Sequence, residues 1–193
     1  MPKQASDSRT RILREAARLF AAKGYAGTTM DEVAAAAKLN KATVYHYFAS
    51  KALVLYTMYI ETATTALDTI QALPSDMPAD LALRKLVEAN LEIAAERPNE
   101  TAVYFREIDW IKEWLPTKLY KELHVKEVAY FSALRDLLSR GRADGLFAEV
   151  DPNAAVQMVV GSLSWATRTG PKSAAADVGS RLADALLNGL LRR

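Results

Sequence analysis

The chain has 193 residues, half of them apolar, a formal net charge of +2 and no cysteine. This length and apolar content are sufficient for a sizeable buried core, and the lack of cysteine excludes disulfides and thiolate chemistry. Because no run of about eighteen apolar residues occurs and no apolar leader opens the chain, we expect a cytoplasmic protein without a membrane partner.

The charge is divided unevenly along the chain. Residues 1–51 carry nine Lys or Arg against four Asp or Glu, a net charge of +5. Residues 52–193 carry sixteen against nineteen, a net charge of −3. A small basic unit joined to a mildly acidic one is typical of a nucleic-acid-binding part fused to a part with another task.

Composition predicts an all-α fold, because glycine and proline are sparse and no long alternation of apolar and polar residues indicates a sheet. The first helix is expected from Asp7 to Lys23, where the apolar residues form one stripe. Gly24 fits the left-handed position that follows many helix ends. The residues before Asp7 are expected to be frayed.

Two short helices follow. Thr29 and Glu32 have the spacing of a capping box, which predicts that a second helix begins at about Thr29. After a three-residue turn, Asn40 is a good N-cap for a third helix over residues 41–48. Two short helices joined by such a turn indicate a helix-turn-helix unit.

The outward side chains of the third helix suit contact with DNA. They supply a cation, a hydroxyl group and flat rings, which can meet phosphates and thymine methyl groups. The alternative is that the tyrosines are core aromatics of a helical bundle. Three consecutive rings, Tyr45, His46 and Tyr47, span nearly the whole circumference of a helix, which argues against burying them all.

The rest of the chain continues the helical pattern. Residues 51–73 lack Gly and Pro and predict a rigid rod that joins the basic part to the remainder. An aromatic-rich segment covers residues 99–115. Further helices are expected at residues 80–97, 116–142, 152–168 and 173–191. The last two have apolar faces wider than a surface helix needs, so we expect something else to cover them.

Three groups of residues among the first fifty or so carry a family resemblance. They are Ile12, Ala16, Phe20 and Gly24-Tyr25; residues 28–34; and residues 43–48 followed by Ser50-Lys51. On these residues the chain resembles the TetR family of bacterial transcriptional regulators. The family's usual Gly-Val-Ser before the recognition helix is replaced by Lys38-Leu39-Asn40, which keeps the inward apolar residue and the cap.

The resemblance implies a three-helix DNA-binding domain at residues 1–50 and a six-helix effector-binding and dimerisation domain at residues 51–193. It also implies a homodimer joined through the last two helices as a four-helix bundle. The residues expected at that interface are apolar or small: Val156, Val160, Leu163, Leu182, Leu186, Gly189 and Leu190.

By the family pattern, the DNA contacts fall on the recognition helix and beside it. Lys51 is expected to meet a phosphate from the start of the fourth helix, and Thr29 to do so from the N-terminus of the second. The full set is Thr29, Lys41, Ala42, Thr43, Tyr45, His46, Tyr47 and Lys51.

The later part of the chain has a weaker resemblance, to a subgroup that responds to fatty-acyl or steroid-derived coenzyme A thioesters. The residues that carry it are Gly145, Phe147, Asp151-Pro152, Ala155, Gly161, Trp165 and Arg168. Thr169 stands where that subgroup often has an aromatic residue.

An effector pocket is expected among the helices of this later part. The candidate lining residues are aromatic or apolar, with cations and a histidine for a polar end. They are Tyr104, Phe105, Arg106, Ile108, Trp110, His124, Tyr130, Phe131, Trp165 and Arg168. Alternatively, each aromatic is plain core, Arg106 pairs with Glu107 or Asp109, and His124 is a solvated or core histidine.

The sequence therefore predicts a dimeric, ligand-responsive repressor that binds a palindromic operator in double-stranded DNA. A small, largely apolar effector, with acyl-CoA type esters among the candidates, would release it by favouring another spacing of the two heads. An activator of the same fold and a nonspecific nucleic-acid-binding helical protein remain alternatives. We expect no enzyme, cofactor or metal site, because the chain lacks a phosphate-binding glycine loop and paired metal-ligand spacing.

Overall fold

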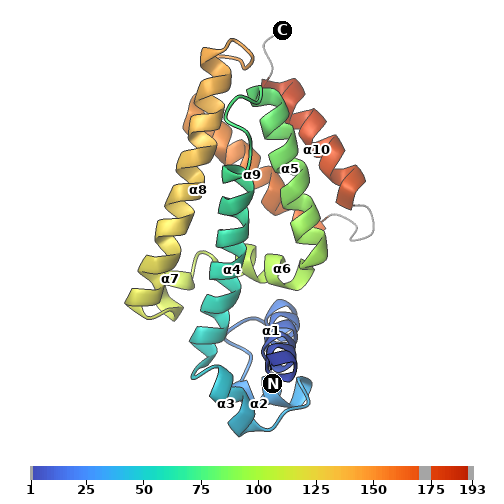
Figure 1. The fold of residues 1–193 in the computed structure, drawn as a ribbon, viewed down its shortest axis with the longest axis vertical. Coiled ribbons are helices and arrows are strands. Elements are labelled where there is room, and N and C mark those ends of the chain that lie inside the picture. The colour runs from blue at the N-terminus through green and yellow to red at the C-terminus, as the bar shows by residue number, and fades with distance from the viewer. Residues whose placement is uncertain (1, 170–174, 191–193) are drawn as a thin grey trace. The chain divides into compact units, whose positions relative to one another are not determined.

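The computed structural model describes residues 2–169 and 175–190, and every regular element in those residues is an α-helix (Figure 1). The predicted all-α fold is thus confirmed. The ten helices are α1 (Pro2–Lys23), α2 (Met30–Ala36), α3 (Lys41–Tyr47), α4 (Lys51–Gln71), α5 (Ala79–Glu96), α6 (Pro98–Glu107), α7 (Ile111–Trp114), α8 (Thr117–Ala143), α9 (Pro152–Thr169) and α10 (Ala175–Leu190). None of these helices combines the length and the apolar character that a membrane span requires.

The chain divides into two compact units. The first unit combines the residues up to Thr62 with Asn99–His124, and the second unit combines Ala63–Pro98 with the residues from Val125 onward. Helices α4 and α8 therefore each contribute to both units. The boundary predicted at residue 50 separates a DNA-binding part from an effector-binding part, whereas the two units are defined by compactness alone. The predicted boundary stays a prediction.

The first unit is built on α1, which packs against α2, while α2 packs against α3. The predicted apolar stripe of α1 is buried, with Ile12, Ala16 and Phe20 fully enclosed. Val33 of α2 and Val44 of α3 are enclosed in the same way. Burial of these apolar side chains supplies most of the favourable free energy of folding for so small a group of helices.

Two boundaries differ from the sequence-based expectation. Helix α1 begins at Pro2, earlier than the predicted Asp7, and proline is well suited to a first helical turn because it has no N–H to leave unpaired. The aromatic-rich segment forms two helices, α6 and the short α7, separated by a turn at residues 108–110. The part of the chain after α3 thus contains seven described helices, one more than the resemblance implied.

The second unit has one continuous core. Helix α5 packs against α10 and α9, which also pack against each other; Figure 1 shows α10 running beside α5. Leu83, Leu86 and Val87 of α5, Leu134 of α8 and Val159 of α9 are fully buried within this core. The wide apolar faces of the last two helices are therefore covered in large part by the chain itself.

Candidate nucleic-acid interface

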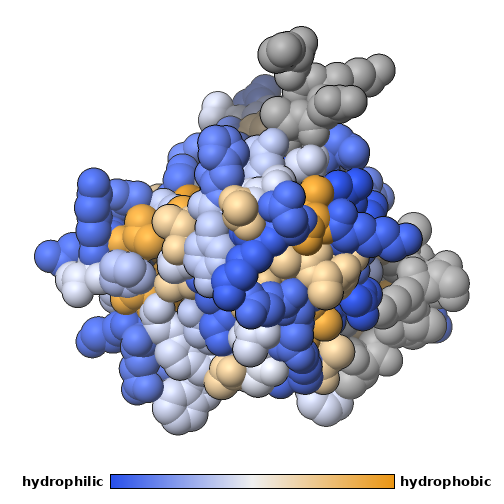
Figure 2. Space-filling model, turned by 90° about the horizontal axis from the view of Figure 1, so that it is seen from below, coloured by the Kyte–Doolittle hydropathy of each residue, from blue (hydrophilic) through white to orange (hydrophobic). Residues whose placement is uncertain are grey.

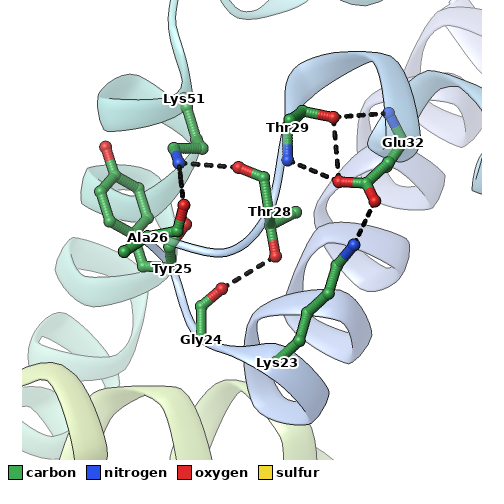
Figure 3. Close-up of polar contacts among 8 residues, drawn as sticks. All are labelled: Lys23, Gly24, Tyr25, Ala26, Thr28, Thr29, Glu32 and Lys51. Atoms are coloured by element: carbon green, nitrogen blue, oxygen red, sulfur yellow. Dashed lines mark hydrogen bonds and ion pairs between the residues drawn. The ribbon is translucent and has the colours of Figure 1, made fainter.

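Helix α2 begins with the predicted capping box. The backbone N–H of Glu32 donates to Thr29 Oγ1 at 3.3 Å, and the backbone N–H of Thr29 donates to Glu32 Oε2 at 2.8 Å. The Thr29 hydroxyl donates to the same carboxylate oxygen at 2.9 Å (Figure 3). Reciprocal bonds of this kind satisfy N–H groups that a helix start leaves without partners, so the start of α2 is fixed locally.

The same carboxylate binds Lys23 of α1. The Lys23 ammonium, with the Thr29 donors, lowers the pKa of Glu32 to about 2. The N–H and the hydroxyl of Thr29 are thus both engaged with a negatively charged group of the chain itself. The predicted phosphate contact of Thr29 stays a prediction, and a phosphate there would compete with that carboxylate for the same donors.

Helix α3 is held by one cap and two apolar anchors. Asn40 Oδ1 accepts the backbone N–H of Thr43 at 2.7 Å, as the sequence predicts. Val44 and Phe48 are buried, and they fix the inward face of the helix. Residues of the opposite face, Lys41 and Tyr45 among them, are exposed.

The outward face of α3 carries the predicted DNA-contacting side chains. Lys41, Ala42 and His46 are exposed, and Tyr45 exposes 41% of its surface. Thr43 and Tyr47 are half-buried, and the His46 and Tyr47 rings meet edge to face at 5.4 Å. The alternative of core tyrosines is therefore wrong for α3. Figure 2 looks onto this end of the first unit and shows a mainly hydrophilic surface with small, separate apolar areas.

Lys51 is the first residue of α4, as the resemblance implied, and its ammonium binds backbone carbonyl groups of the loop between α1 and α2. Its ammonium donates to the carbonyl oxygens of Tyr25 at 2.8 Å and Thr28 at 2.7 Å, and lies 3.5 Å from that of Ala26 (Figure 3). Burial lowers the pKa of Lys51. Because the ammonium has three donors and faces three carbonyl groups, it is a structural clamp on the loop between α1 and α2. The predicted phosphate contact of Lys51 stays a prediction.

The same loop is held from α6. Arg106 donates to the carbonyl oxygens of Phe20 and Ala21 at the end of α1, the latter at 2.9 Å. Glu107, which is only 5% exposed, accepts the backbone N–H of Tyr25 at 3.2 Å and the Arg106 Nε–H at 3.0 Å. A cation at the C-terminus of a helix complements its dipole, so this pair fixes the end of α1.

Tyr25 connects these two sets of contacts. Its ring stacks on Trp114 of α7 with centroids 4.6 Å apart, and the Lys51 ammonium lies 4.3 Å from its centroid. Phe20 meets the ring edge-on at 5.4 Å. Sequence reasoning missed the contacts of Tyr25 with Trp114, Glu107 and Lys51, because each joins residues far apart in the chain.

The predicted effector residues belong to different units. In the first unit Arg106 donates to a carbonyl oxygen of α1 and pairs with Glu107 at 3.0 Å, which is the alternative that the sequence offered for it. Trp110 is half exposed, and the exposed His124 stacks on Tyr120 with ring centroids 5.7 Å apart. Tyr104 and Phe105 meet edge to face at 5.5 Å, and Ile108 is half-buried.

In the second unit Tyr130 and Phe131 are half-buried and Trp165 is 64% exposed. The side chain of Arg168 lies outside the described residues. Burial raises the pKa of Tyr130 to about 12, against the opposing effect of a hydrogen bond with the Asn90 side chain. Asn90 also donates to the Leu86 carbonyl oxygen at 2.8 Å. Sequence reasoning did not select it, because nothing distinguishes an asparagine of this kind before its partners are known.

Described residues of the second unit line at least two hollows. A cavity of about 310 Å³ is bounded by the end of α4, the start of α5 and the last half of α8, with Arg140 and Asp136 in its wall. An open groove of about 490 Å³ runs between α8 and α9 over Phe131, Val156 and Val160. Phe131 is the one predicted effector residue that lines either of these two.

The predicted dimer residues are partly used within the chain. Val156, Leu163 and Leu186 are buried in the second unit's core, whereas Val160 and Leu182 are half-buried and Gly189 is exposed. The side chain of Leu190 lies outside the described residues. The outward face of α9 instead presents Met158, Gly161 and Trp165.

Two family models match this chain, one in its N-terminal part and one in the remainder. Residues 12–55 match the family described as bacterial regulatory proteins, tetR family. Residues 76–190 match the family described as tetracyclin repressor-like, C-terminal domain. The HTH-type transcriptional repressor NicS of Pseudomonas putida is 26% identical over 148 residues, which are 76% of this chain and 68% of NicS.

Solved structures share the fold over almost the whole chain. PfmR, a TetR family transcriptional regulator from Thermus thermophilus, is 29% identical with a TM-score of 0.82, covering 94% of this chain and 100% of PfmR. AibR, solved in complex with isovaleryl coenzyme A and operator DNA, is 22% identical with a TM-score of 0.77. That likeness covers 95% of this chain and 98% of AibR, and at this identity it shows the fold alone.

Proposed function

The chain belongs to the TetR family of transcriptional regulators, and from this premise we propose that it represses transcription by binding an operator in double-stranded DNA through α3. The observation that carries the proposal is the outward face of α3, where Lys41, Tyr45 and His46 are exposed on a basic part of the chain. Rings and hydroxyl groups can read base edges and thymine methyl groups, while cations meet phosphates. The repressor relative NicS supports this direction of regulation over activation.

We propose further that the protein acts as a homodimer on a palindromic operator, because one two-fold axis would place two α3 helices in successive major grooves. The outward face of α9 supports a dimer contact: Trp165 and Met158 are exposed, and a Cβ placed on Gly161 would meet no atom within 4 Å. A large exposed apolar surface on a folded chain commonly marks a protein contact. A role on chromosomal DNA would place the protein in the cytoplasm.

The proposed effector is a small, largely apolar molecule, and acyl-CoA esters are the first class to test. The neighbour AibR was solved with isovaleryl coenzyme A and operator DNA, which is the reason for starting with this class. An effector can release DNA only by binding one state of the dimer more tightly than another, typically by about 1 to 3 kcal/mol.

Contacts of the first unit supply a physical link for such a response. Arg106 and Glu107 end α6 and hold the loop at the end of α1, while Lys51 begins α4 and holds the same loop. A movement of either helix would therefore act on the loop that leads into α2.

The test begins with selection of an operator from a pool of random duplexes by the full-length protein. Salt titrations on the selected duplex and on a random duplex of equal length then measure specificity. A specific regulator should bind the selected duplex at least about 1000-fold more tightly. Equal affinity for both duplexes, with a steep salt dependence, would establish the alternative of a nonspecific binder.

Tyr45→Ala should then weaken binding to the selected duplex by about 1 to 3 kcal/mol while leaving the fold intact. Addition of acyl-CoA esters of different chain length should shift both the melting temperature and operator affinity if this effector class is right. If the esters change neither the melting temperature nor operator affinity, the proposal of an acyl-CoA effector is wrong, and the DNA-binding proposal is unaffected.

A further inference from the structure

The smaller cavity of the second unit has two side chains of opposite charge in its wall. This cavity of about 310 Å³ lies where the end of α4, the start of α5 and the last half of α8 meet. Asp136 and Arg140 stand one helical turn apart on α8, and both line it. Side chains at this spacing are neighbours on a helix surface and commonly form an ion pair. These two do not bind each other, and the reason lies in the partners of Arg140.

Arg140 is held by the linker between α4 and α5. Its Nη1 group donates to the carbonyl oxygen of Ser75, and its Nη2 group donates to that of Met77 at 3.2 Å. Its Nε–H is buried without a partner among the described residues. Because a guanidinium has five N–H donors, each Nη group keeps one further N–H.

The linker contacts hold the guanidinium away from Asp136. The Asp136 side chain is exposed, and it accepts no hydrogen bond and forms no ion pair within the described part of the chain. The cavity wall therefore offers one cation with remaining donors and one carboxylate with unused acceptors. A charge that is partly removed from water is unfavourable unless a group of opposite charge meets it.

Most of the remaining wall is apolar. The apolar lining comes from α4, the linker, α5 and α8: Ile70, Leu73, Pro74, Ala82, Ala133 and Leu137. The cavity volume is at the lower end of the range of about 300 to 1000 Å³ that is usual for ligand pockets. A ligand that fits here is therefore small, with an apolar body and two opposite charges close together.

We propose that this cavity binds an α-amino acid with an apolar side chain. The ligand carboxylate accepts from the remaining Nη N–H groups of Arg140, the ligand ammonium donates to the Asp136 carboxylate, and the ligand side chain covers the apolar wall. The two charges of an α-amino acid are attached to one carbon atom, which matches charges on neighbouring positions of one helix face. Charge-assisted hydrogen bonds of this kind are stronger than neutral ones. The site is additional to the apolar effector proposed above, and binding to it does not depend on DNA.

Isothermal titration calorimetry of the full-length protein without DNA tests the proposal. The probes are L-valine, L-leucine and L-phenylalanine, whose side chains differ in size, and at least one should bind. Analogues of the binding amino acid then keep only one of its two charges; for leucine they are 4-methylpentanoate and 3-methylbutylamine. Each analogue should bind about tenfold or more weakly, because a hydrogen bond between charged groups is lost.

Asp136→Asn tests where the ammonium binds. This variant should weaken binding of the amino acid by about tenfold or more. It should not weaken binding of the analogue without an ammonium, because that analogue has no group for Asp136 to accept from. Asp144→Asn is the matched control, since Asp144 is exposed just beyond the end of α8, outside the cavity wall, and its substitution removes the same charge. Asp144→Asn should bind the amino acid as the wild type does.

The inference is overturned if none of the three amino acids binds, or if an analogue with one charge binds as tightly as the amino acid. Unchanged binding in Asp136→Asn would also overturn it. Equal losses of affinity in Asp136→Asn and Asp144→Asn would do the same, because the effect would then come from overall charge and not from this cavity.

Discussion

The ammonium of Lys51 lies 4.3 Å from the centroid of the Tyr25 ring and donates to the Tyr25 carbonyl oxygen at 2.8 Å. A lysine at the first position of α4 thereby closes the loop that precedes α2. A contribution of Lys51 to stability and the predicted phosphate contact can be told apart by measurement.

Lys51→Met should lower the free energy of unfolding by about 2 kcal/mol, because charge-assisted hydrogen bonds to backbone carbonyls are lost. Urea unfolding gives this quantity, with Lys85→Met, an exposed site on α5, as the control expected to stay within about 0.5 kcal/mol of wild type. If Lys51 met a phosphate instead, the operator salt slope would fall by about 0.9 while stability hardly changed.

Stability should depend on Glu32 in acid. Its pKa is lowered from 4.5 to about 2 in the folded chain, so its contribution is fully present above the unfolded pKa and is lost as the pH falls towards 2. Urea unfolding of wild type and Glu32→Gln between pH 6 and pH 2 should show a difference that shrinks through that window. A difference that is the same at every pH would mean that the charge of Glu32 does not matter.

Lys38 occupies a backbone conformation that side chains disfavour. Its φ is 53°, in the left-handed region, where a Cβ costs roughly 1 to 2 kcal/mol. Lys38→Gly should raise the free energy of unfolding by about 0.5 to 1 kcal/mol, since glycine recovers the strain but loses chain entropy. Lys38→Ala keeps the Cβ and should give no such gain in the free energy of unfolding. An equal gain for Lys38→Ala would mean that loss of the lysine charge, and not relief of backbone strain, causes the stabilisation.

Arg106→Met should destabilise the first unit by about 1 to 3 kcal/mol, because it leaves the buried Glu107 carboxylate without its cation and the end of α1 without a donor. In the double variant with Glu107→Gln, the loss should be smaller than the two single losses added together. Additive losses in thermal unfolding would show that the two side chains act independently.

Trp165→Asp should weaken self-association if the outward face of α9 is the dimer contact, because it places a charge in an apolar interface. Val125→Asp is the matched control, since Val125 is 68% exposed on α8. Sedimentation equilibrium should show a dissociation constant raised at least tenfold for Trp165→Asp alone. Equal effects of both substitutions would exclude a specific contact through α9.

The sequence was sufficient where structure depends on neighbours in the chain. The capping box of Thr29 with Glu32, the Asn40 cap and the buried Val44 all follow from residues within one or two turns. The carbonyl partners of Lys51 and Arg106 were not predicted, because a cation near a predicted binding surface has no local signal that says which distant acceptor it meets. The same limit applied to Val156 and Leu186, whose apolar character does not tell whether their own chain or a second copy covers them.

The loop at residues 24–28 has a consequence for how the chain is made. Its closure requires Lys51, which lies 26 positions after Tyr25, and Glu107, which lies 82 positions after it. During synthesis the Lys51 contact can form once residue 51 has left the ribosome, whereas the Glu107 contact cannot form until residue 107 has followed. A fragment that ends at residue 62 would keep every side chain of α3 and the Lys51 contact with the loop at residues 24–28. It would lack the contact of Glu107 with the same loop.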